Sequence, residues 1–442
     1  MSHVISTPVP KQSSAQADLP TWGRCDTMWM LGLYGTAIGA GTLFLPINAG
    51  IGGFWPLLIM ALLAFPLTYF SHRGLNRFVL SSQKKGSDIT EVAEEHFGSL
   101  SGTTITLLYF MTFYPVMMLY SIAITNTVES FMINQLSLEG WVPHRSVLSL
   151  VLILALMAVV RAGADLVVKV MSWLVYPFVT ALMILGAYLI PEWSFEAITT
   201  AGSLTDALQK GAFWKTLWLS IPVMVFAFNH AAIISSFAVD QQKHHGHHAE
   251  ASSERVLFWA HVMMVISVMF FVFSCVLSLT PADLATARDQ NLSILSYLAN
   301  HFSNPIIAWM APLVAIVAIG KSFLGHYLGT KEGLNGLAVK WLNLRGKAVS
   351  TASLDRFAAL FMIVSCWLAA TFNPDIISTI ERLVGPVMAA MLFLMPMYAI
   401  AKVPSMRRYS GALSNIFVVV IGIVAITAMF CDLLPLFFGM MS

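Results

Sequence analysis

The amino-acid sequence predicts an all-α integral membrane protein. Hydrophobic residues make up 57% of the 442-residue chain and charged residues only 10%, whereas a soluble domain carries about 25% charged residues. The mean hydropathy is +0.76, and the apolar residues gather in runs of the roughly 20 residues that a helix needs to cross a bilayer. The lipid bilayer is therefore the expected environment of the chain.

Applying this length in chain order gives eleven spans. The segment before them is polar, so residues 1–25 are predicted to be a disordered tail and residues 26–442 a single transmembrane domain. The fourth span is short, but Arg145 and Arg161 bracket it and can reach the two membrane surfaces. The spans cover residues 28–48, 51–71, 103–128, 146–160, 167–190, 213–238, 256–279, 306–329, 357–373, 383–401 and 415–438.

The basic residues are distributed unevenly between the two sides of these spans. Positively charged loops stay in the cytoplasm, and an N-terminus placed there puts most of the 24 Lys and Arg residues in inner segments. The sequence therefore predicts an N-terminus inside and a C-terminus outside. Lys321 falls within the membrane, and only five basic residues fall outside: Arg145, Lys210, Lys215, Arg288 and Arg382.

Several classes of function are disfavoured. A formal net charge of +2 is too small to indicate a nucleic-acid partner. The four cysteines show no C-x-x-C spacing, so no metal or redox site is expected. The extramembrane segments are too short for a catalytic domain and the spans carry no paired acid–base residues, so neither an enzyme nor a cofactor is predicted. No carboxylate or cysteine framework is expected around the run His244–His248, which is predicted to be an ordinary loop.

The first span contains an unusual cluster of residues that weaken a helix: Gly35, Gly39, Gly41 and Pro46. Two interpretations are open. Gly35 and Gly39 form a G-x-x-x-G pair, which often serves close helix packing. Alternatively, the helix is broken there and offers its backbone groups to a ligand.

A matching feature five spans later favours the second interpretation. Span 213–238 is otherwise apolar but contains Pro222, Asn229, His230, Ser235 and Ser236. Neighbouring backbone could satisfy Asn229 and His230, but polar groups inside a membrane are costly, which favours a functional role. Breaks at corresponding places in two halves predict inverted repeats, over residues 28–190 and 213–401, with an additional helix over 415–438.

The interior of the spans contains almost no carboxylates, which disfavours a cationic ligand. A zwitterion can be held differently, because the positive N-terminal end of a half-helix binds a carboxylate and carbonyls freed by a break bind an ammonium group. The two breaks therefore favour a small zwitterion as the ligand.

Lys321 is the most unusual single residue of the spans. A buried amine can lose its proton, which suits coupling to a proton gradient, but Lys321 could instead tie the eighth span to carbonyls freed by the first break. Ser322 and His326 lie near it, and His326 could relay protons or act as a cap. Lys169, early in the fifth span, is a rival proton-coupling candidate or an interfacial anchor.

At this point the residues resemble a known family, the bacterial serine and threonine transporters, which are hydroxy and aromatic amino acid permeases of the amino acid–polyamine–organocation superfamily. The resemblance runs from about Asp26 to the C-terminus and is strongest with the serine transporters. It rests on "DTMWMLGLYGTAIGAGTLFLPINAG", "ITEVAEEHFG", "YSIAITNTVESF", "NHAAIISSFAV", "LTPADLATARDQNLSILSYLANHF", "KSFLGHYLGTKEGLNG" and "LMPMYAIAKVPSMRRYSG".

The resemblance implies a LeuT-type fold, with five plus five helices, broken helices 1 and 6, and an eleventh helix. It implies a proton-coupled importer of L-serine in the bacterial inner membrane, with a periplasmic C-terminus. In the first span it implies substrate contacts from Thr36, Ala37, Gly39, Ala40 and Gly41. In the sixth span it implies contacts from Phe226, Asn229, His230, Ser235 and Ser236.

One departure from the family leaves alternatives open. Members of the family that this chain resembles carry Ser-Pro where this chain has Ala231 and Ala232, so a hydroxyl and a helix breaker are missing. Threonine, cysteine and aromatic amino acids are therefore alternative substrates. An alternative of a different class is an amino acid sensor with transporter ancestry, although no sizeable soluble output domain is present.

Overall fold

The computed structural model describes residues 21–161, 164–195, 202–346 and 350–430, and only the backbone of residues 164–172 and of Leu344. All regular secondary structure in these ranges is helical. Residues 1–20 of the predicted tail and 431–438 of the last predicted span lie outside them. Arg24 and Cys25, assigned to the tail from the sequence, are instead the first residues of a helix.

The first half of the chain supplies the first five predicted spans, and the first of them is made of two helices. They are α1 (Arg24–Ala37) with α2 (Ala40–Ile51), α3 (Phe54–Leu80), α4 (Ile89–Asn134), α5 (Arg145–Arg161) and α6 (Ala164–Tyr188).

The second half repeats this pattern, again with a first span made of two helices. Its spans are α9 (Gly211–Ala227) with α10 (Ile234–His245), α11 (Ala249–Ser278), α14 (Pro305–Leu344), α15 (Thr351–Phe372), and the series α16 (Ile376–Thr379), α17 (Gly385–Ala389) and α18 (Met395–Lys402). The additional helix is α19 (Leu413–Thr427), and three short helices lie between spans: α8 (Leu204–Leu208), α12 (Pro281–Asp289) and α13 (Ile294–His301).

By length and composition, eight helices of the described part can cross a membrane, or nine when α1 and α2 count as one bent span. That count takes Gly211–Ser278 as one helix and omits α5, which has only 17 residues. The backbone reverses at Gly246, where φ is +52°, so α11 is a separate span from α9 and α10. With α5 included, the described residues supply the eleven predicted spans.

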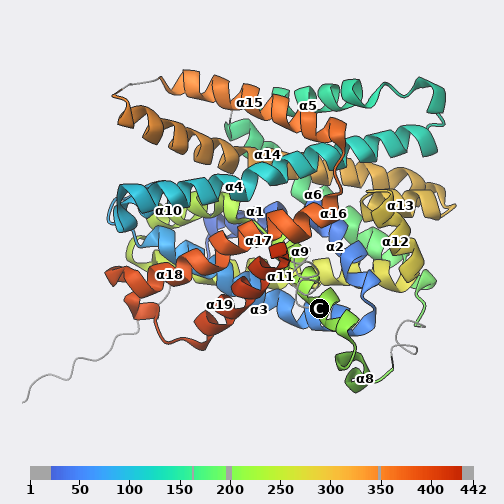
Figure 1. Cartoon of the computed structure of the whole chain (residues 1–442), viewed down its shortest axis with the longest axis horizontal. Helices are drawn as coiled ribbons and strands as arrows, with labels where there is room; N and C mark the ends of the chain where they lie inside the picture. The colour runs from blue at the N-terminus through green and yellow to red at the C-terminus, as the bar shows by residue number, and fades with distance from the viewer. Residues whose placement is uncertain (1–20, 162–163, 196–201, 347–349, 431–442) are drawn as a thin grey trace, which may run out of the picture.

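Figure 1 shows how the helices are arranged. α5 and α15 lie side by side along one edge, and α4 and α14 pack together beneath them. α12 and α13 lie together at one end of the molecule, and α10 lies toward the opposite end. α15 exposes large apolar side chains at helical spacing, Phe357, Leu360, Val364 and Leu368, which is typical of a helix face in contact with lipid.

A short helix precedes the third span. Asp88 caps the start of α4, where its carboxylate accepts hydrogen bonds from the N–H groups of Thr90 and Glu91 at 2.8 and 2.9 Å. A turn at Gly98, with φ +77°, then separates this short helix from the membrane-spanning part of α4.

The predicted end of the eighth span is wrong, because α14 continues to Leu344 and not only to residue 329. Gly333 and Gly336 do not end the helix, since both serve its close packing on α4. A Cβ atom at Gly333 would lie 3.0 Å from Phe110 Cα, and one at Gly336 would lie 3.2 Å from a methyl group of Thr106. Glu332, assigned to a loop from the sequence, is therefore part of a packed helix.

Candidate functional site

The first span is broken where its glycines predicted a break. α1 ends at Ala37 and α2 begins at Ala40, and their axes are bent by 52°. Ile38 between them is extended, with φ −75° and ψ 91°. Thr42 stabilises the start of α2, since its hydroxyl donates to the Gly39 carbonyl at 2.6 Å.

The sixth span is broken as well, although it lacks the Ser-Pro pair. α9 ends at Ala227, a 3₁₀ turn covers Ala231–Ile233, and α10 begins at Ile234. The Asn229 side chain supplies the turn, because its Oδ1 accepts a hydrogen bond from the Ala231 N–H at 3.0 Å. The effect of Ala231 and Ala232 on the geometry, which the sequence left open, is thus limited: the break forms without proline.

The two breaks touch each other through their backbones. A Cβ atom at Gly41 would lie 2.8 Å from Ala227 Cα, closer than side chains pack. α14 covers the same place, because Ser322 Oγ accepts a hydrogen bond from the Ala40 N–H at 3.1 Å. The N-terminal end of α2 and the C-terminal end of α9 therefore meet beside α14.

Lys321 is bound to the first break. Its side chain is 1% exposed, and its Nζ donates hydrogen bonds to the carbonyls of Gly35 and of Ile38, the latter at 2.8 Å. The Phe178 ring of α6 lies 5.0 Å from the ammonium group. Lys321 thus occupies carbonyls that an intact helix would use for its own hydrogen bonds.

A cavity of about 150 Å³ lies beside this contact, between α1, α6, α10 and α14. Three predicted site residues line it: Thr36, Ser236 and Lys321. Glu332 lines it too, but the fall in hydropathy after residue 329 places it in a loop and hides it from a reading of the sequence. Helical periodicity offered a signal, since Lys321, Leu328 and Glu332 are seven and then four residues apart and share one face of α14.

Other predicted site residues are buried at the breaks but contact different groups. The His230 ring stacks on His72 of α3, with centroids 3.7 Å apart. Ser235 Oγ accepts from the Ile89 N–H at 3.2 Å, which joins α10 to α4. His326 donates from Nδ1 to the Ser322 carbonyl at 2.9 Å and meets the Tyr120 ring edge-on.

The remaining predicted residues fall into two groups. Ala37, Ala40 and Phe226 are buried at the ends of α1, α2 and α9. The side chain of Lys169, in α6, lies outside the described residues, so its predicted role in proton coupling is not addressed by the structure.

At the end predicted to be cytoplasmic, α1 is tied to α10. Trp29 Nε1 donates to Asp240 Oδ2 at 2.6 Å, and Cys25 Sγ lies 3.1 Å from the same oxygen. His244 Nδ1 lies 3.3 Å from Asp240 Oδ1, and His245 Nε2 lies 3.0 Å from Asp26 Oδ1. The expectation that no carboxylate or cysteine framework lies beside His244–His248 is therefore wrong. Asp240 precedes His244 by one helical turn, and folding brings in Cys25 and Asp26 from 215 and 219 positions away.

At the other end, one buried carboxylate joins three elements. Glu381, 2% exposed and in the turn after α16, accepts from Asn48 Nδ2 of α2 at 2.7 Å. Arg288 of α12 donates from Nη2 to the same carboxylate at 3.0 Å. This contact holds the short outer helices against the first span.

Comparison with known proteins gives consistent matches over the length of the chain. Residues 29–431 match the tryptophan/tyrosine permease family. The chain is 60% identical to the serine transporter SdaC of Escherichia coli K12 over 93% of this chain and 96% of that protein. It is 43% identical to the threonine/serine transporter TdcC of Yersinia enterocolitica over 92% of this chain and 95% of that protein.

Two solved structures share the arrangement of helices at low sequence identity. MhsT in complex with L-phenylalanine has a TM-score of 0.57 and 13% identity, over 93% of this chain and 98% of that one. A Na⁺-coupled sialic acid symporter in a substrate-bound outward-open state has a TM-score of 0.53 and 14% identity, over 91% of this chain and 89% of that one. These likenesses confirm the LeuT-type fold.

Proposed function

This chain belongs to the tryptophan/tyrosine permease family, and we propose that it imports L-serine, or a similar small neutral amino acid, together with a proton. The observation that carries the proposal is the contact between the broken ends of α2 and α9 at Gly41 and Ala227. Backbone N–H and C=O groups freed by two breaks at one place can hold both charges of an amino acid without a buried carboxylate.

The main chain would hold the charged groups of the substrate. The backbone from Ala37 to Gly41, between the end of α1 and the start of α2, would bind its carboxylate, and carbonyls near both breaks would bind its ammonium group. The side chains of Asn229 and Ser236 would contact the side chain of the substrate.

Lys321 would provide the coupling to protons. Its ammonium group already lies on the carbonyls of Gly35 and Ile38, where it acts as a fixed cation. Loss of its proton would remove the charge and weaken its hold on the first break. The state of the proton would thereby be linked to the shape of the substrate site.

The chain is a multi-pass membrane protein, and its relatives are named transporters of bacteria. We place its N-terminus in the cytoplasm and its C-terminus in the periplasm, on the basis of the basic residues in the loops. In that orientation the contact between α1 and α10 closes the cytoplasmic side, and the contact around Glu381 closes the periplasmic side.

Uptake into proteoliposomes tests this function. Purified protein should accumulate radiolabelled L-serine against its gradient when an inward proton gradient is imposed, and a sodium gradient of the same size should give no accumulation. Unlabelled serine, threonine, cysteine and tryptophan should compete in decreasing order of effect. Binding of serine without any accumulation or exchange would indicate a sensor, and accumulation driven by sodium alone would exclude proton symport.

A further inference from the structure

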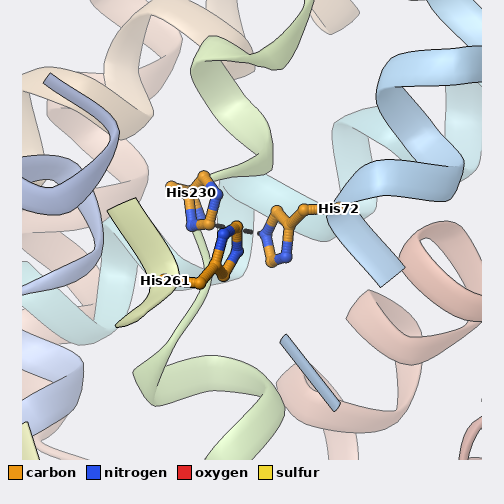
Figure 2. A group of neighbouring side chains, drawn as sticks. All are labelled: His72, His230 and His261. Carbon is orange, nitrogen blue, oxygen red and sulfur yellow. Dashed lines mark hydrogen bonds between the residues drawn. The ribbon is translucent and has the colours of Figure 1, made fainter. Parts of the chain in front are cut away.

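Three histidines from separate elements meet in the core of the protein. His72 comes from α3, His230 from the break between α9 and α10, and His261 from α11, and Figure 2 shows their rings turned toward one another. All three are at most 2% exposed. One ring nitrogen of each lies within 4.8 Å of a ring nitrogen of the other two.

The hydrogen bonds of the three rings determine where their protons lie. Each Nδ1 lies on a backbone carbonyl: His72 on Thr68 at 2.8 Å, His230 on Phe228 at 3.1 Å, and His261 on Leu257 at 2.5 Å. A carbonyl oxygen only accepts, so each Nδ1 carries the hydrogen of a neutral ring. Each Nε2 is then a bare lone pair.

Two of these lone pairs have no partner. Nε2 of His230 and Nε2 of His261 are buried and, among the described residues, receive no hydrogen bond. The third, on His72, accepts a long bond of 3.3 Å from the backbone N–H of His230. The cluster therefore has two buried acceptors more than it has donors, and a buried acceptor without a donor is unfavourable.

We propose that His72, His230 and His261 form a proton-binding site, distinct from Lys321, that controls the break in the sixth span. A proton from solution binds the Nε2 lone pair of one ring and adds one positive charge, and no bond between heavy atoms changes. The two Nε2 atoms without a partner, on His230 and His261, would share this proton, so that one becomes an N–H donor and the other its acceptor. This inference rests on the transport function proposed above, because it links proton binding to the substrate site.

The link to the break runs through the backbone of His230. Its N–H donates to His72 Nε2, and its neighbour Asn229 caps the Ala231 N–H. A positive charge on the His230 ring would therefore arise on a residue whose backbone forms the break.

The surroundings favour a proton over a metal ion. The His72 and His230 rings are parallel within 7°, so their in-plane lone pairs cannot both point at one ion. Tyr69 meets His261 edge-on at 5.8 Å, and Tyr34 of α1 is bound to Ser267 of α11. Arg73 lies over the Tyr69 and Phe70 rings and donates to Ser414. Among the described residues, no carboxylate, lysine or arginine is recorded as bonded to the three rings.

His261→Asn tests the site, because the asparagine amide keeps a donor where Nδ1 lies and removes Nε2. His144→Asn, at an exposed outer position, is the matched control. We would measure the protons taken up per serine bound by full-length protein in lipid nanodiscs, with a pH indicator in weak buffer. His261→Asn should bind serine but take up fewer protons, by up to one, and its serine affinity should vary less between about pH 5 and 8. His144→Asn should match the natural protein.

A second measurement needs neither a variant nor serine. Infrared difference spectra of protein with ¹³C-labelled histidine, recorded as the pH is lowered, should show imidazolium bands from a buried histidine. Their absence, or equal proton uptake by His261→Asn and the natural protein, would overturn the proposal. So would one tightly bound Zn²⁺ per chain whose chelation abolishes the pH dependence. Failure to bind any amino acid would refute the transport function and leave the infrared test of this site intact.

Discussion

At the scale of single residues, Lys321 is the polar group on which the first break depends most. Its ammonium group is buried and satisfies the carbonyls of Gly35 and Ile38. Both interpretations offered by the sequence remain compatible with this geometry, since a structural tie and a proton-sensing cation make the same contacts. They differ in what happens when the charge is removed and a donor is kept.

Replacing Lys321 should separate these roles. Lys321→Ala leaves two buried carbonyls without donors, at about 1–3 kcal/mol each, and should lose proton-driven accumulation of serine while counterflow exchange survives. Lys321→Gln keeps a neutral donor and should also lose accumulation if the charge is needed. The measurement is uptake with and without a pH gradient in proteoliposomes.

Lys331→Ala is the control for this experiment, because Lys331 lies on the same helix but forms a partly exposed ion pair with Asp355 at 2.9 Å. It should behave as the natural protein does. Undiminished accumulation in Lys321→Ala would remove the coupling role, and recovery in Lys321→Gln would assign Lys321 a structural role only.

At the scale of elements, Gly35, Gly39 and Gly41 of the first span have three different neighbours. Added Cβ atoms would overlap Val175 of α6 at Gly35 and Ser322 Oγ of α14 at Gly39, and would meet the backbone of α9 at Gly41. The sequence is compatible with close packing or with a broken helix, and the structure contains both. The small residues allow α6, α14 and α9 to approach the first span closely, and the break occurs where these three helices approach it.

The neighbours predict which glycine substitution can be rescued. Gly39→Ala should lower stability and serine affinity, and adding Ser322→Ala should restore part of the loss, because the atom that overlaps is the end of a side chain. Gly41→Ala should not be rescued, since Ala227 Cα lies 2.8 Å from the new methyl group. Overpacking of this kind costs about 1–3 kcal/mol.

Thermal unfolding and serine binding of the single and double variants measure these effects. Strictly additive losses in the Gly39→Ala, Ser322→Ala pair would contradict the contact between them.

At the scale of the whole molecule, two sets of contacts close the opposite ends of the first span. One joins Trp29 to Asp240, and the other joins Asn48 and Arg288 to Glu381. A carrier that works by alternating access has to open these ends in turn. We therefore expect each of these two contacts to break when its end of the carrier opens.

Arg288→Ala should weaken the outer contact, because it removes one of the cations beside the buried Glu381 carboxylate and leaves it with Asn48 and the nearby charge of Arg382. We expect a loss of about 1–3 kcal/mol, less than for a fully buried pair, since Arg288 is 28% exposed. Adding Glu381→Gln, which keeps a partner for Asn48, should recover part of that stability. Melting temperatures of the natural protein, the two single variants and the double variant give the coupling between Arg288 and Glu381. Purely additive changes would show that the pair contributes nothing.

Much of this protein follows from its sequence alone. Apolar runs of fixed length determined the spans, because a bilayer demands about 20 apolar residues from a helix. The glycines of the first span and the polar residues of the sixth marked the two breaks, and the motifs identified the family. These features are local, so the order of residues is enough to reveal them.

Only the tertiary structure decided which side chains meet. His72 and His261 lie in runs that gave no signal of their own, and they reach His230 because α3 and α11 pack against the sixth span. Glu332 was placed in a loop because hydropathy falls after residue 329, whereas packing of glycines on α4 extends the helix. Asp240 contacts Cys25 and Trp29, which lie more than 200 residues earlier in the chain. Contacts between distant segments depend on how whole helices pack, which no local pattern of residues records.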